Sequence, residues 1–317
     1  MSLFARCSPR VMVVLAVLGW VYWPTFRELC DTWTGQPEYS HGILVPFFAL
    51  YLLMRRAPVA ADTTTRPWPV ASFGLIALAI LMRLAGSATS FLPLEGLSFV
   101  LSLTALAMLA GGRAGLAQFW QPIVFLLFII PLPYEVSRLM GAELQRVATI
   151  ASTFLLQCFG QPAISEGNRI LISDVTLNVV EACSGLRMLV TFLAFSVAAV
   201  FLLDRHWIVK AIVLGSAVPI ALVTNILRIT ATGLAHIGLH DSPSRDRVLG
   251  VIHDFNGWMM MPVGLTFLLF ELWLLRYLLI ERTAPGGPVI VGGTALTATP
   301  AASRPRYASV IQMPLGR

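Results

Sequence analysis

The sequence predicts an all-α polytopic membrane protein with about eight transmembrane helices. Of its 317 residues, 57% are hydrophobic and only 12% are charged, whereas soluble chains carry about 25% charged residues. The mean hydropathy is +0.78, and several apolar runs approach the roughly 20 residues that cross a bilayer. This composition excludes a soluble enzyme. The net charge of +6 comes from scattered basic residues, so it does not indicate nucleic-acid binding.

Eight apolar runs are candidate transmembrane helices. The first follows a short basic stretch, but no small-residue cleavage site comes after it, so we interpret it as a retained helix and not as a signal peptide. The second is short for a bilayer. The runs are 11–23, 42–54, 69–85, 92–110, 116–132, 186–203, 208–227 and 257–279.

The basic residues predict the orientation of these helices. With the N-terminus inside, the majority of the 22 basic residues fall in cytoplasmic segments, as the positive-inside rule requires. Both termini are then cytoplasmic. We expect residues 1–281 to form one transmembrane domain. Residues 282–317 are rich in Gly, Pro, Ala, Thr and Ser without a periodic apolar face, which predicts a disordered cytoplasmic tail.

Between the fifth and sixth runs, residues 135–159 place charged side chains among apolar ones at helical spacing. This pattern predicts an amphipathic helix lying on the outer leaflet. A ninth crossing by residues 136–160 is the alternative. We prefer the surface helix, because a crossing there would move Arg205 and Lys210 to the outer side, against the positive-inside rule.

Directly after this helix, the chain alternates apolar and polar residues on both sides of Ser173-Asp174. Such alternation about a turn predicts a short β-hairpin on the outer side. The hairpin leads the chain to Cys183.

Three polar residues are predicted to lie at one depth in the membrane. Cys183 stands at the outer end of the sixth run, the seventh run returns to Arg228, and an outer loop leads to His253 at the start of the eighth run. Counted by helical rise, these residues fall at the same level, the outer membrane interface.

Cys183 has a setting that favours a reactive thiolate. A lone cysteine in an apolar chain is usually a small buried hydrophobe, and that interpretation stands for the other three cysteines. Ser184, however, is a good N-cap residue, so the thiol would lie at a helix N-terminus. Arg187, one turn further on, adds a positive charge on the same face. Such surroundings lower the pKa of a thiol.

Arg228 and His253 also have ordinary interpretations. Arg228 could extend to the lipid headgroups, but Asn225 on the same helical face favours a functional buried polar cluster. His253 could cap a helix or bind a metal, but no partners at metal-ligand spacing accompany it. We therefore predict no metal and no cofactor. His41, in Tyr39-Ser-His-Gly, also falls on the outer side, and its role stays open.

A cysteine nucleophile, a histidine that moves protons and an arginine that faces an oxyanion are sufficient for acyl transfer through a thioester. In a second interpretation, Ser184 attacks with His253 as the base, although Ala182 stands where the first glycine of a Gly-x-Ser-Gly pattern would be. A non-enzymatic transporter or assembly factor for envelope polymers is a third. Transporters place their polar residues near the bilayer midplane, not at one face.

Over residues 39–279, the sequence resembles the exosortase and archaeosortase family of membrane-embedded cysteine transpeptidases. A histidine in the third of the motifs is similar to the bacterial exosortase branch, since archaeal relatives tend to have arginine there. The motifs are Ala182-Cys-Ser-Gly-Leu-Arg187, Pro219-Ile-Ala-Leu with Asn225-Ile-Leu-Arg228-Ile, and His253-Asp-Phe-Asn-Gly-Trp258, supported by Tyr39-Ser-His-Gly-Ile-Leu-Val-Pro46 and Pro131-Leu-Pro.

This resemblance implies that Cys183 is the nucleophile and that Arg228 and His253 are the other catalytic residues. The substrates would be secreted proteins whose C-terminal signal consists of a Pro-Glu-Pro-like motif, one transmembrane helix and a basic end. Cleavage would occur on the outer face of the cytoplasmic (inner) membrane, with transfer to an unidentified envelope or polymer acceptor. Beside the catalytic residues, we expect a supporting role for Arg187, Ser184, Asn225, Asn256 and His41.

Overall fold

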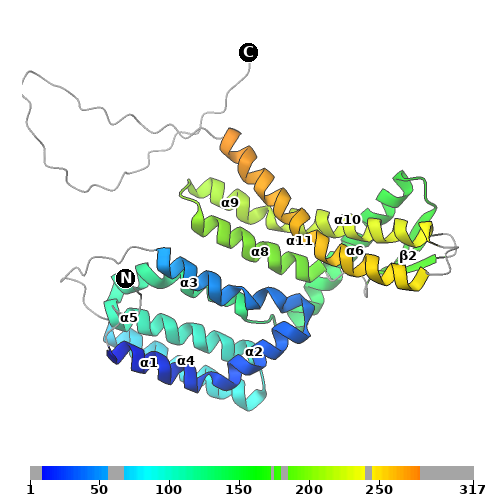
Figure 1. Cartoon of the computed structure of the whole chain (residues 1–317). Coiled ribbons are helices and arrows are strands. Elements are labelled where there is room, and N and C mark those ends of the chain that lie inside the picture. The colour runs from blue at the N-terminus through cyan, green and yellow to red at the C-terminus, as the bar shows by residue number, and fades with distance from the viewer. Residues whose placement is uncertain (1–8, 56–67, 173–174, 180–184, 240–244, 279–317) are drawn as a thin grey trace, which may run out of the picture.

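The computed structural model describes residues 9–55, 68–172, 175–179, 185–239 and 245–278, with the backbone alone for most of residues 245–258. Figure 1 shows helices that pack as two groups, one from each half of the chain. The first group contains α1 (Pro9–Val21), α2 (Trp23–Gly35), η2 (Pro37–Ile43), α3 (Val45–Arg55), α4 (Pro69–Thr89), α5 (Leu92–Phe125) and η3 (Leu126–Ile129). The second contains α6 (Tyr134–Cys158), β1 (Ala163–Glu166), β2 (Arg169–Ile172), β3 (Val175–Asn178), α8 (Gly185–Leu202), α9 (Trp207–Gly215), α10 (Ala217–Gly238) and α11 (Arg245–Leu278).

The chain is a mostly helical, multi-span membrane protein, as predicted. Among the described residues, five helices are long and apolar enough to cross a bilayer. The two runs nearest the N-terminus are shorter: only Met12–Val21 is apolar in the first, and α3 has 11 residues, about 16 Å of helix against a hydrocarbon core of about 30 Å. The total of eight crossings stays a prediction. The five spans are Pro69–Thr89, Leu92–Ile129, Gly185–Leu202, Trp207–Gly238 and Met259–Leu278.

The longest of these segments folds back on itself. Within α5, Gly112 has φ 52° and ψ −129°, a conformation that residues with a Cβ rarely adopt. Gly115 then lies directly against the carbonyl oxygen of Ala107, which a straight helix would hold about 12 Å away along its axis. Further along, a Cβ at Gly96 would stand 2.9 Å from the side chain of Ile130. Two limbs of α5 therefore run antiparallel on either side of Gly112.

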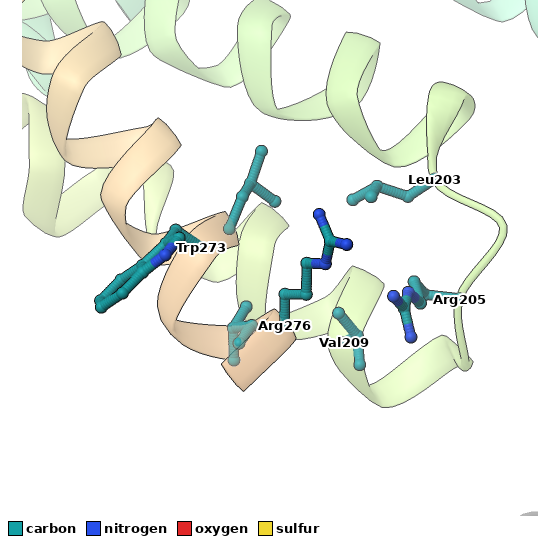
Figure 2. A pocket seen from close by; sticks show the side chains of 7 residues that line it. Leu203, Arg205, Val209, Trp273 and Arg276 are labelled. Atoms are coloured by element: carbon teal, nitrogen blue, oxygen red, sulfur yellow. The ribbon is translucent and has the colours of Figure 1, made fainter. Parts of the chain in front are cut away.

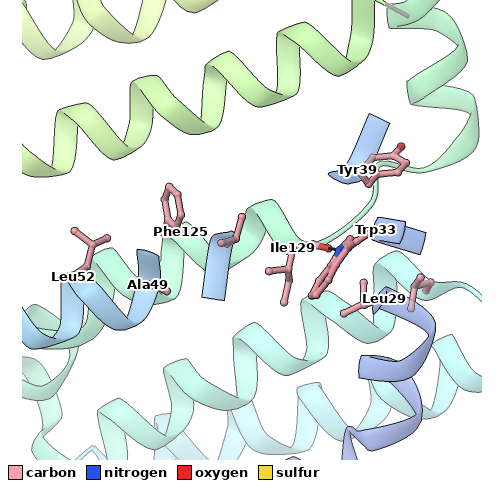
Figure 3. Packing of buried hydrophobic residues seen from close by; sticks show 9 residues of the cluster. Leu29, Trp33, Tyr39, Ala49, Leu52, Phe125 and Ile129 are labelled. Carbon is pink, nitrogen blue, oxygen red and sulfur yellow. Dashed lines mark hydrogen bonds between the residues drawn. The ribbon is translucent and has the colours of Figure 1, made fainter. Parts of the chain in front are cut away.

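A buried cluster fixes η2, the segment that carries Tyr39-Ser-His-Gly. The indole Nε1 of Trp33 in α2 donates to the carbonyl oxygen of Ile129 at 3.0 Å, and the ring lies so close to Gly42 that a Cβ there would overlap it. Figure 3 shows Trp33 beside Ile129, with Leu29 and Tyr39 nearby. The hydrogen bond and the packed ring hold η2 between α2 and η3.

The region after α5 contains the predicted helix and strand segments. The helix predicted over 135–159 is α6, which buries Ala148, Ser152 and Leu156 on one face and packs against α10. Ser152 donates to the carbonyl oxygen of Ile226 at 3.3 Å. The position of this helix on the outer leaflet stays a prediction.

Three short strands pair antiparallel in the described part of the chain, in the order β1-β2-β3. Sequence reasoning missed β1. Gly167, with φ 61°, makes the turn between β1 and β2. The apolar residues of the sheet pack against α6 and α10 in one cluster, with Ile170, Ile172 and Leu177 on the sheet and Leu156 and Ile229 on the helices. The side of the membrane on which the sheet lies stays a prediction.

The predicted start of the last helix is wrong. An outer loop was expected before His253, but α11 begins at Arg245, so His253 lies inside a helix, two turns from its start. The predicted eighth apolar run begins at 257, yet Val248, Leu249 and Ile252 recur at helical spacing well before it, after three charged residues at 245–247. The apolar spacing of residues 248–252 therefore favours a helix despite the charged residues before it.

Gly115→Ala is expected to destabilise the fold, because the added methyl group would meet the backbone carbonyl of Ala107 and not a side chain that can move. Overpacking of this kind costs about 1–3 kcal/mol. The matched control is Gly111→Ala, four residues away, where a Cβ meets nothing within 4 Å. Thermal unfolding of the purified protein in detergent is the measurement. Equal Tm values for the two variants would contradict the folded-back arrangement of α5.

Candidate functional site

Helices α6, α8 and α10 meet at Gly185, the first residue of α8. A Cβ at this position would lie 3.2 Å from the amide nitrogen Nδ2 of Asn225 and 3.4 Å from the Cβ of Leu144. A larger residue here would require Asn225 to move away by a few tenths of an ångström. Cys183 and Ser184, which precede Gly185 in sequence, lie outside the described residues.

Asn225 and Arg228 form a buried polar pair on α10. Their exposed fractions are 1% and 4%. Both side-chain polar atoms of Asn225, and Nε of Arg228, have no hydrogen-bond partner within the described residues. Buried polar groups without partners are rare, because each costs the free energy of its lost hydration. These atoms therefore keep their hydrogen-bonding capacity unused within the described residues.

Arg187, half-buried on α8, extends the positive charge of the pair. It interacts unfavourably with the charge of Arg228 and favourably with the carboxylate of Glu38 in η2. Its Nε also has no hydrogen-bond partner in the part of the chain described by the structure. Two guanidinium groups and one carboxylate, contributed by three elements, thus make a positively charged centre suited to an anion.

Glu38 was missed as a site residue by sequence reasoning. It stands directly before Tyr39-Ser-His-Gly, one of the motifs of the family resemblance, and this adjacency is the signal that could have identified it. In space, η2 contacts α8. The motif from the first half of the chain therefore reaches the arginines of the second half.

His41 is held neutral by its surroundings. The side chain is 7% exposed, and its burial lowers the pKa below the ordinary value of 6.5, partly opposed by the backbone carbonyls of Glu38 and Phe128. The ring atom Nδ1 has no hydrogen-bond partner among the described groups. His41 therefore adds no positive charge to the site at neutral pH.

The backbone of His253 lies at the level of Arg228. Helices α10 and α11 run antiparallel: Ser216 donates to the carboxylate of Glu271, and Ala221 shares a packed cluster with Met260. From Ala221 to Arg228 the chain advances by seven residues, about 10.5 Å. His253 lies seven residues before Met260 on α11, which is the same distance. Because α11 runs antiparallel to α10, this step leads in the same direction as the step from Ala221 to Arg228.

The structure thus brings together three of the predicted site residues, Arg187, Asn225 and Arg228, close to the start of α8. His253 and Asn256 are both on α11, and their side chains are outside the described part. His41 is on η2, one turn from Glu38. Two free cysteines in the described part of the chain, Cys30 and Cys158, are exposed, so the interpretation of these two as small buried hydrophobes is wrong.

The chain matches a known protein family. A family model described as transmembrane exosortase covers residues 33–270, about three quarters of the chain. The matched region includes η2, α8, α10 and the part of α11 that contains His253. No curated protein and no solved structure matches the chain.

The lowered pKa of His41 predicts that stability falls in acid. Because the unfolded chain binds a proton on this residue more readily than the folded chain does, stability from this group is complete above pH 6.5 and is lost as the pH falls from 6.5 towards the lowered pKa. His41→Gln should flatten this part of the curve. The measurement is Tm in detergent between about pH 8 and about pH 5. Identical pH profiles for the variant and the unmodified chain would refute the assignment.

Proposed function

The chain belongs to the transmembrane exosortase family, and on this premise we propose that it is a cysteine transpeptidase that works inside the membrane. In this proposal Cys183 is the nucleophile, Arg228 faces the oxyanion and His253 transfers protons. The observation that supports it most directly is the buried amide of Asn225, which lies against Gly185, two residues after Cys183, and has no hydrogen-bond partner within the described residues, with the buried Arg228 one turn further along α10.

The positive charge of Arg187 and Arg228 has two roles in this mechanism. A nearby guanidinium stabilises a thiolate and so lowers the pKa of the thiol that forms it. The same charge stabilises the oxyanion of the tetrahedral intermediate, where one well-placed donor contributes about 3 kcal/mol to transition-state binding. Arg187 and Arg228 are close enough to repel each other, and an anion between them would relieve that repulsion.

The reaction proceeds in two acyl transfers. The thiolate sulfur of Cys183 bonds to the peptide carbonyl carbon, the C–N bond breaks, and the leaving amine takes a proton from the imidazolium of His253. The acceptor nucleophile then attacks the thioester carbon and gives its proton to the neutral imidazole, and the thiolate leaves. Proton transfer by a positioned side chain contributes about 100- to 10,000-fold to the rate.

A membrane-anchored signal fits this site. We propose that the substrates are secreted proteins with a Pro-Glu-Pro-like motif, a transmembrane helix and a basic end, and that the acceptor is an envelope or polymer component. A substrate helix inserted beside the bundle already has its depth and direction fixed by the bilayer. Such fixed geometry removes part of the entropy cost of bringing the reacting groups together.

The remaining architecture follows from this proposal. Eight crossings with both termini in the cytoplasm would place the start of α8 on the outer face of the inner membrane. Residues 1–281 would form the catalytic domain and residues 282–317 a cytoplasmic tail. The outer face is where a secreted substrate is accessible.

Cys183→Ala should abolish processing of a co-expressed substrate that carries such a C-terminal signal, because no thioester can form. Immunoblotting for the shortened product is the measurement. Cys158→Ala, which removes an exposed cysteine distant in sequence from the site, is the matched control and should retain activity. Ser184→Ala tests the serine alternative: loss of processing in Ser184→Ala with full activity in Cys183→Ala would assign the nucleophile to the serine.

Arg228→Lys should reduce processing severely although it keeps the charge. Lysine has no planar fork, so it does not donate to the oxyanion and to a second group in the same geometry. The loss of one oxyanion donor corresponds to a decrease of about 100- to 1,000-fold. Arg146→Lys, an exposed arginine on α6, is the control. A rate for Arg228→Lys near that of the control would remove Arg228 from the mechanism.

A further inference from the structure

A cavity with an apolar lining and two arginines lies at the far end of α8 from the candidate site. It has a volume of about 280 Å³ and is lined by the turn after α8, by α9 and by the last two turns of α11. Figure 2 shows Arg276 reaching from α11 towards Leu203, with Arg205 beside the turn. The apolar part of its lining is formed by Leu203, Val209, Leu272, Trp273 and Leu275.

Both charged residues in the lining of this cavity are arginines. Arg205 and Arg276 come from different elements and line the same space. Within the described residues, Arg276 has no ion pair. Two guanidinium groups over an apolar floor are suited to a phosphate group.

The surroundings of the cavity have the character of a membrane interface. Trp207 at the start of α9 and Trp273 and Tyr277 at the end of α11 are all exposed, and the rings of Trp273 and Tyr277 are stacked. Exposed tryptophan and tyrosine residues gather at the headgroup level of a bilayer. Lys210 adds a further positive charge on α9.

We propose that this cavity binds the phosphate of an anionic phospholipid. The cavity volume is slightly below the roughly 300 Å³ of the smallest ligand pockets. A cavity of this size suits a lipid headgroup alone, with the acyl chains outside the cavity. Leu269 and Phe270, one turn before the cavity on α11, are exposed apolar side chains. The acyl chains of the lipid would pack against them. Basic pockets between helices at a membrane surface are a known means of binding anionic headgroups.

The test uses the full chain purified in a neutral detergent and titrated with short-chain phosphatidylglycerol, phosphatidylcholine or inorganic phosphate. Native mass spectrometry counts the bound lipid. Phosphatidylglycerol should bind, and Arg205→Gln and Arg276→Gln should each weaken its binding about fivefold, with about 25-fold for the double variant. Arg113→Gln removes an equal charge from an exposed position in the turn of α5 and should have no effect.

Three results would overturn the proposal. The first is equal binding of phosphatidylglycerol by the double variant and by Arg113→Gln. The second is binding of phosphatidylcholine as tight as that of phosphatidylglycerol. The third is full displacement of phosphatidylglycerol by inorganic phosphate, which would identify a soluble anion as the ligand. Should the double variant not fold, as judged by its Tm without lipid, the two single variants carry the test. Peptide processing is not part of the readout.

Discussion

The burial of Arg228 and Asn225 inside an apolar helix bundle is the constraint on which the rest of the structure depends. In a membrane protein no bulk water reaches such groups, and each unpaired polar atom costs several kcal/mol. The bundle holds them where α8 begins, because Gly185 allows Asn225 to approach and because Arg187 and Glu38 surround the guanidinium with charges of both signs. A chain that keeps such a costly arrangement has a use for it, and polar residues inside membranes are usually functional.

Positioning of this centre requires both halves of the chain. The second half contributes the antiparallel helices α8 and α10, with α11 beside them. The first half contributes η2, which is held by the indole of Trp33 against Gly42 and Ile129. That cluster in turn needs the limbs of α5 to fold back at Gly112, because Ile129 is reached only at the end of the second limb. The turn at Gly112 in α5 therefore supports the segment that carries the carboxylate of Glu38.

Hydropathy and periodicity predicted the membrane class and the helix over 135–159, because both depend on local pattern. They also placed Arg228 and Asn225 on one helical face, which the structure confirms as a buried pair. The helix before His253 was missed because three consecutive charges conceal an apolar spacing that follows them. Glu38 was missed for a different reason: Arg187, whose charge it attracts, is about 150 residues away in sequence, and no local pattern encodes an interaction of that range.

The attraction between Glu38 and Arg187 has a consequence for the integrity of the protein. Because one charge comes from each half, a fragment consisting of α6 to α11 would contain two mutually repelling arginines without this carboxylate. If the two halves were produced as separate polypeptides, their reassociation would have to bring Glu38 back towards Arg187 before the centre regained its charge balance. Recovery of function on mixing would then report directly on the docking of η2 against α8.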